Sequence, residues 1–144
     1  MSGLGLQANF TYADSKAPSS LAGFTAPLTQ LSKYSYNLAG IYEKSGVSLR
    51  VAYNYRSSFL SSILAGGYTP PGGATTSFVF PTFTKGYGWL DASLNYDVTP
   101  HFTLSVDAQN LLRTQIQQYY QVQTQPGQFT IDDRQFMIGA RIKF

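Results

Sequence analysis

The stretch Val47-Ser48-Leu49-Arg50-Val51-Ala52-Tyr53-Asn54-Tyr55-Arg56 alternates between two kinds of side chain along its whole length. Aliphatic and tyrosyl side chains take every odd position, and small or polar side chains take every even one. Successive side chains of a β-strand point to opposite faces of its sheet. This period of two therefore predicts a strand with one apolar and one polar face.

Five further segments repeat the alternation, and turn residues separate them. With the stretch quoted above, the predicted strands cover residues 3–14, 33–43, 46–56, 87–98, 102–120 and 134–144. Apart from the fifth, each has 11 or 12 residues, which matches the roughly 9–11 residues that a tilted strand needs to cross a bilayer. The alternation blurs at Asn110-Leu111-Leu112, which indicates a bulge inside the fifth strand.

The connections between these segments alternate between short and long. Glu43-Lys44-Ser45-Gly46 and Thr99-Pro100-His101 are tight turns. The long connections, which we expect to be loops, are Ser15–Ser32, Ser57–Gly86 and Gln121–Asp133. Outer-membrane barrels have short periplasmic turns and long extracellular loops. The sequence therefore predicts an all-β, antiparallel up-and-down meander of six long strands, with Phe144 on the periplasmic side.

The mid-strand charges lie on the polar face, and no charge interrupts the apolar face away from the strand ends. A charge at mid-depth on a lipid-facing surface costs roughly 2–4 kcal/mol, so this is the pattern that a membrane barrel requires. A soluble sheet with one wet face gives the same alternation, but tyrosines near the strand ends favour the girdles of a barrel. The polar residues that we expect to face the lumen are Arg50, Asn54, Arg56, Asp91, Asn95, Asp107 and Arg141.

Composition agrees with a membrane surface. Charged residues make up 12% of the chain, about half of the roughly 25% usual in soluble proteins, and aromatic residues reach 15%. The net charge of +3 is small and scattered, which argues against nucleic acid, and the absence of Cys excludes a disulfide framework. The start lacks a signal peptide, and six strands are fewer than the eight of the smallest barrels. We therefore expect a fragment whose missing strands precede Met1.

Three stretches in the order expected for one family carry a resemblance. They are Tyr42–Ser57, Leu90–Thr99 and Leu104–Leu111, followed by a last strand that begins at Arg134 and ends on Phe144. Together they resemble the C-terminal part of the β-barrel of TonB-dependent receptors. The resemblance implies the last six strands of a 22-stranded barrel in the outer membrane of a Gram-negative bacterium. In the intact receptor it also implies a plug domain, which this chain lacks, and a TonB energising complex. The ligand taken up would be a siderophore, a cobalamin or a carbohydrate.

The last strand also resembles the signal that the outer-membrane assembly machinery reads. Gly139, Ile142 and Phe144 fit this signal, whereas Met137 stands where a polar residue is usual. Such recognition would work by strand addition at an exposed edge, with alternate side chains giving specificity. A plain lipid-facing strand would have almost the same sequence.

No residues point to catalysis, a cofactor or a metal, so we expect that the protein is not an enzyme. His101 is the only histidine and has no partner at ligand spacing. Asp132-Asp133 could bind a hard cation, but two adjacent acids in a loop are usually solvated. Asp91 and Asp107 could be neighbours, but nothing in the sequence desolvates one of them as glycoside hydrolysis requires.

Aromatic residues gather in and beside the longest connection, where they could stack on a ligand. These candidate ligand residues are Tyr68, Phe78, Phe80, Phe83, Tyr87 and Trp89. The competing interpretation is self-packing of the loop, with Trp89 as a girdle residue near a strand end. Two other functions stay open: a passive outer-membrane porin, and a soluble β-sandwich that binds carbohydrate.

Overall fold

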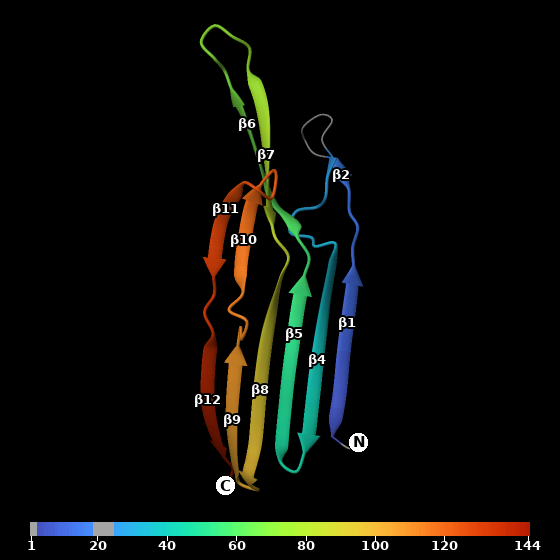
Figure 1. The fold of residues 1–144 in the computed structure, drawn as a ribbon, viewed down its shortest axis with the longest axis vertical. Helices are drawn as coiled ribbons and strands as arrows, with labels where there is room; N and C mark the ends of the chain where they lie inside the picture. The colour runs from blue at the N-terminus through green and yellow to red at the C-terminus, as the bar shows by residue number, and fades with distance from the viewer. Residues whose placement is uncertain (1–2, 19–24) are drawn as a thin grey trace.

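The computed structural model describes residues 3–18 and 25–144, and all regular structure in them is β. The strands form three antiparallel sheets, which confirms the predicted all-β, antiparallel class. No helix in the described residues is long and apolar enough to span a membrane. The molecule is elongated, with the largest sheet in its lower part and a hairpin at its upper end (Figure 1).

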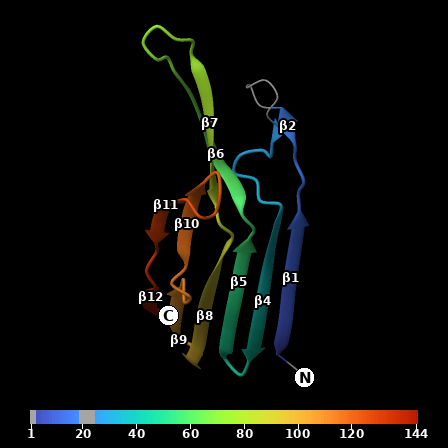
Figure 2. The ribbon, with the colours of Figure 1, turned by 45° about the horizontal axis from the view of Figure 1, so that its top comes forward.

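The main sheet has six strands in the order in which they follow one another along the chain, β1-β4-β5-β8-β9-β12. They are β1 (Leu4–Tyr12), β4 (Tyr34–Lys44), β5 (Val47–Arg56), β8 (Tyr87–Thr99), β9 (Phe102–Gln109) and β12 (Gln135–Ile142). β1 and β12 are its two open edges, so the sheet does not close on itself (Figures 1 and 2).

A second sheet of four strands continues the wall above the main sheet, in the order β11-β10-β7-β6. It consists of β6 (Phe59–Tyr68), β7 (Thr76–Thr84), β10 (Gln115–Tyr120) and β11 (Pro126–Ile131). The prediction that the long connections are loops was therefore wrong for most of Ser57–Gly86 and for the Pro126–Ile131 part of Gln121–Asp133. The β-branched and aromatic residues of β7 suit a strand, and pairing with β6 outweighs Pro81.

The first long connection contains a minimal third sheet, β2 (Ala17–Pro18) with β3 (Thr25–Ala26). Residues 19–24 of this predicted loop lie outside the described residues. In the part of the chain that the structure describes there are thus twelve strands rather than six.

The predicted fifth strand, 102–120, was wrong, because the chain leaves the main sheet after Gln109. Asn110 and Arg113 have φ of 53° and 51°, which ends the strand in a turn rather than a bulge. The Asn110 side chain stabilises this turn: its Oδ1 accepts a hydrogen bond from the Thr114 N–H at 2.9 Å, and its Nδ2 donates to the Asp132 carbonyl at 2.7 Å. A polar side chain that satisfies the backbone locally competes with the sheet ladder.

The turn between β4 and β5 fixes the register of the main sheet. Ser45 and Gly46 both have positive φ, 53° and 78°, between the paired residues Lys44 and Val47. This is the two-residue geometry that matches the twist of a hairpin. A slip of one residue would move every side chain to the other face, so this turn also decides which residues share a face.

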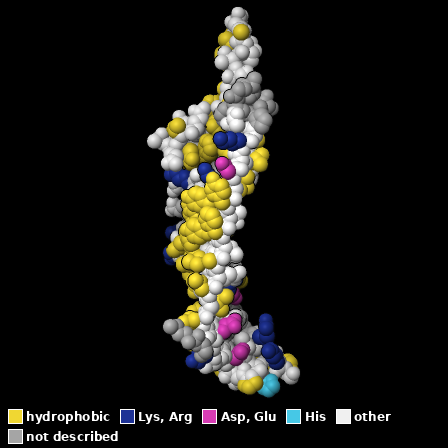
Figure 3. Space-filling view, turned by 90° about the vertical axis from the view of Figure 1, so that its right-hand side faces the viewer, with side chains coloured by type: hydrophobic (Ala, Val, Ile, Leu, Met, Phe, Trp, Pro, Cys, Tyr) yellow, Lys and Arg dark blue, Asp and Glu magenta, His cyan; other side chains and the backbone are white. Residues whose placement is uncertain are grey.

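The main sheet is a single layer whose apolar face is uncovered. Leu6 is 77% exposed and Ile138 is 83% exposed, and in the described residues Leu60 is the only large side chain that is fully buried. Hydrophobic side chains form a band at mid-height, with charged side chains above and below it (Figure 3). A soluble β-sandwich would need a second sheet against this face, and none of the described strands lies there.

Candidate functional site

The polar face of the main sheet brings together charges from neighbouring strands. Arg50 on β5 lies opposite Ser93 on β8, which lies opposite Asp107 on β9. Arg50, Asp91 and Asp107 line a hollow of about 250 Å³. No ion pair joins them within residues 3–18 and 25–144. The pairing thus places these three predicted residues on one face.

The other predicted polar residues share this face. Asn54 is paired with Asn37, whose side-chain amide donates a hydrogen bond to the Asn54 Oδ1. Asn95 and Arg141 line a second hollow, of about 340 Å³, lower on the sheet. Met137 lies opposite Asp107 and is therefore also on the polar face, where the last strand departs from its alternation.

Arg56, at the end of β5, is occupied by contacts within the protein. Its Nε donates to the Ser32 Oγ and its Nη2 to the Gln30 carbonyl, both at 2.9 Å. Its guanidinium lies 3.9 Å from the centre of the Phe59 ring. Arg56 thus fastens the end of the first long connection to the top of the main sheet.

Tyr87 and Trp89 lie on the polar face, so the interpretation of Trp89 as a lipid-facing girdle residue was wrong. Trp89 pairs with Asn54 and Tyr87 with Arg56 across β5 and β8. The two rings are 5.8 Å apart. The alternation along the sequence already predicts this face for Trp89, because Trp89 lies two residues before Asp91 and side chains two residues apart in a strand share a face.

Trp89 lines a hollow of about 420 Å³ at the upper end of the main sheet, together with Asp91, Gln109, Asn110, Asp132, Asp133 and Gln135. The sequence reasoning missed the three amides, although each is a polar residue at or just beyond a strand end. Asp133 is paired with the Arg113 guanidinium at 3.1 Å, and the Asp91 carboxylate accepts a hydrogen bond from the Asn110 N–H at 2.9 Å. No cluster of three or more potential metal ligands occurs in the described residues.

The remaining aromatic candidates divide into two groups. Tyr68, Phe78 and Phe80 share one face of the β6–β7 hairpin, since Gly66 opposes Phe78, Leu64 opposes Phe80, and Tyr68 follows Gly66 by two residues. Phe83 is separate from them: its ring stacks on Tyr119 at 5.4 Å with an interplanar angle of 17°, beside the buried Leu60. Phe83 therefore belongs to the packing at the base of the second sheet.

Another hollow, of about 690 Å³, lies between the first long connection and this base. Lys16 and Lys33 line it from the connection, and Phe59, Phe83 and Tyr119 line it from the second sheet. No sequence pattern predicts that these segments meet, because they are far apart along the chain.

Residues 2–111 match the model of a protein family described as TonB dependent receptor-like, beta-barrel. The chain belongs to this family. No curated protein and no solved structure matches it significantly. Members of the family are transport barrels of the outer membrane and not enzymes, and in an intact TonB-dependent receptor the family implies a plug and a TonB contact.

Tyrosines of this receptor barrel gather on the apolar face, at the ends of β4 and β5 that lie away from the tight turn. Tyr36 and Tyr55 stack with ring centres 5.0 Å apart, flanked by Tyr34 and Tyr53. Tyrosyl rings with an apolar body and a polar tip suit the boundary between lipid and water.

The predicted assembly signal lies beyond the residues that match the receptor family model. β12 is an edge of the main sheet, Gly139 pairs with Ser105, and Ile142 pairs with Phe102. Phe144 follows the strand and is fully exposed. The recognition of these residues stays a prediction.

Proposed function

We propose that the chain forms part of the wall of an energised outer-membrane receptor, which takes up a siderophore, a cobalamin or a carbohydrate. The family match carries this proposal. The single-layer sheet supports it, because one face suits lipid and the other suits a polar lumen. β1 and β12 would be continued by further strands of a 22-stranded barrel, since unpaired edges are not tolerated in lipid.

The polar face would turn toward the plug domain. Arg50, Asp91 and Asp107 present charges of both signs around one hollow, which suits a polar partner surface inside the barrel. Asn95 and Arg141 extend this polar surface toward the tight turns. The apolar face, with its tyrosine cluster, would meet the lipid of the outer membrane.

The last strand would be recognised by the outer-membrane assembly machinery before the receptor can transport, through Gly139, Ile142 and Phe144. The open edge of β12 offers backbone groups for strand addition to the assembly machinery. Phe144, which is fully exposed, is the residue whose side chain is most available for such recognition.

Uptake by cells with and without the TonB energising complex tests the transport proposal. Radiolabelled ferric siderophores, cobalamin and neutral oligosaccharides would be offered to cells that express the receptor containing this wall. We expect uptake of one of them to need both the receptor and the energising complex, and the receptor to fractionate with the outer membrane. Uptake that continues at the same rate without the energising complex would instead identify a passive porin.

A further inference from the structure

The β6–β7 hairpin carries no charge along its whole length. The residues from Ser57 to Thr84 include no Asp, Glu, Lys, Arg or His. The hairpin nevertheless projects farther than any other element, as two views show (Figures 1 and 2). With ten residues in β6, its tip lies on the order of 30 Å beyond its base.

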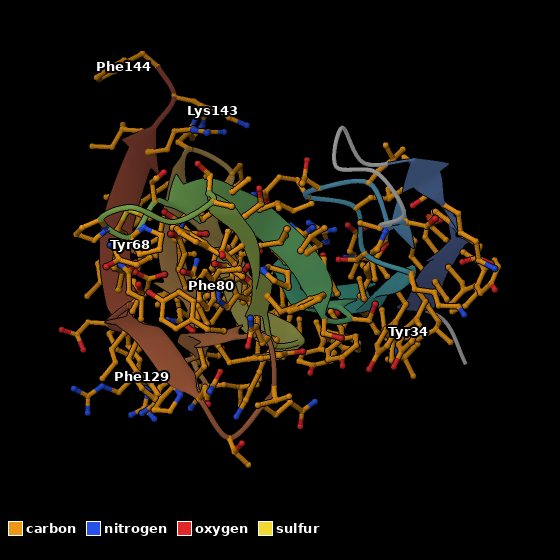
Figure 4. All side chains as sticks on the ribbon, turned by 90° about the horizontal axis from the view of Figure 1, so that it is seen from above. Tyr34, Tyr68, Phe80, Phe129, Lys143 and Phe144 are labelled. Atoms are coloured by element: carbon orange, nitrogen blue, oxygen red, sulfur yellow. The ribbon has the colours of Figure 1, made fainter. Side chains whose placement is uncertain are left out.

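One face of the hairpin carries an apolar strip formed by Leu64, Tyr68, Phe78 and Phe80, which the strand pairing places together. Leu64 and Tyr68 are each 63% exposed, and the strip is uncovered by any described element. The Phe78 and Phe80 rings are 5.3 Å apart. Tyr68 and Phe80 are labelled in the view from above (Figure 4). An exposed apolar strip this far from the barrel wall is typical of an interaction site rather than of lipid contact.

Gly66 leaves room for the ring of Phe78. The ring lies across Gly66, so that a Cβ at this position would be 2.5 Å from the Phe78 Cζ. The Phe78 ring thus lies against the backbone of β6, at an angle of 57° to the Phe80 ring. Hydroxyl groups accompany the strip: Ser62 and Thr76 are on the same face, and the Thr69 and Thr75 hydroxyls are hydrogen-bonded at 2.7 Å near the tip.

We propose that this strip binds a neutral oligosaccharide, which deepens the proposed transport function and rests on it. Aromatic rings offer flat apolar surface to the C–H faces of sugar rings, and neighbouring hydroxyls pair with sugar hydroxyls. On β6 the strip runs from Leu64 to Tyr68, a rise of roughly 13 Å, which is long enough for more than one sugar ring. Because the hairpin has no cation, it has nothing to pair with the charge of an anionic iron chelate or an acidic sugar.

Binding by the receptor purified in detergent tests this inference. The probes are hexamers of glucose, mannose and xylose, with hexagalacturonate as an acidic sugar of equal length, measured by isothermal titration calorimetry. We expect a neutral hexamer to bind and hexagalacturonate to bind at least tenfold more weakly. The double variant Y68A/F80A should lose at least tenfold in affinity. The matched control I63A/V79A, on the opposite face of the same hairpin, should bind like the wild type.

The outcomes separate this inference from the transport proposal. Absence of binding by every neutral hexamer, or equal binding by wild type and Y68A/F80A, would overturn the strip as a sugar site. So would a change in oligomeric state caused by Y68A/F80A with sugar binding unaltered, since that result would assign the strip to a protein partner. If the receptor takes up a different ligand in an energised manner, and Y68A/F80A does not change this uptake, the sugar-binding role of the strip would be contradicted. The transport proposal would still hold. Sugar binding at the strip without energised uptake would support the strip and contradict transport.

Discussion

The main sheet and the β6–β7 hairpin each have an apolar face, but they differ in the charges that they carry. In the main sheet, charges such as Arg50 and Asp107 lie on one face, and the other face carries no charge away from the strand ends. In the hairpin, aromatic residues also fill one face, yet no charge occurs on either face. An apolar stripe therefore does not by itself identify lipid contact, and its distance from the tight turns must be considered as well.

The largest expected effect comes from placing a charge on the apolar face of the main sheet. The same charge on the apolar strip of the hairpin is the comparison. Val51→Arg lies in the middle of β5, where an outward charge should destabilise the barrel by about 2–4 kcal/mol and lower the amount of assembled receptor. Leu64→Arg, on the water-exposed hairpin, should leave assembly unchanged. Heat-modifiable migration of the receptor in outer-membrane fractions measures both. Equal loss in the two variants would abolish the distinction between the regions.

A smaller effect is expected from filling the space above a glycine in the main sheet. The Tyr53 hydroxyl lies over Gly88, where a Cβ would overlap it. Gly88→Ala should cost about 1–3 kcal/mol, because the tyrosine must leave its place. Gly40→Ala on β4 is the control, since nothing lies within 4 Å of the Cβ it adds. Urea unfolding of the receptor in detergent compares the two, and equal midpoints would contradict the role of Tyr53 over Gly88.

The smallest effect is expected at the turn after β9, where the chain leaves the main sheet. The Arg113–Asp133 ion pair there has side-chain exposures of 60% and 79%. Exposed pairs contribute little, so Arg113→Ala should change the free energy of unfolding by less than about 1 kcal/mol. The difference should vanish in 1 M salt. A loss that is large or independent of salt would show that this pair fastens the second sheet to the first.

The sequence was sufficient for the parts of the molecule where one face is charged and the other is not. The alternation around Arg50 and Asp91 predicts their strands and the face on which each side chain lies. It also predicts the face of Trp89, although the aromatic character of Trp89 suggested a girdle residue instead. The hairpin was missed because Gly66-Gly67 and Pro81 are typical of loops, and because Ser61-Ser62 and Phe78-Val79-Phe80 interrupt the alternation of its strands.

The break in the predicted fifth strand and the large hollow by Lys33 could not be predicted in the same way. The break depends on the hydrogen bond that the Asn110 side chain accepts from the Thr114 N–H, and on the one that it donates to the carbonyl of Asp132, which is distant in sequence. The hollow depends on the approach of Phe59 and Tyr119 to the first long connection. Both follow from tertiary contacts that no local pattern encodes.

The main sheet is only one layer thick, and this has a consequence for how such a chain changes over time. In the proposed barrel, adjacent codons would answer to different surroundings: Val51 to hydrocarbon, and its neighbours Arg50 and Ala52 to the enclosed interior. Selection on what passes through the interior could then change every second position without altering how the wall sits in the bilayer.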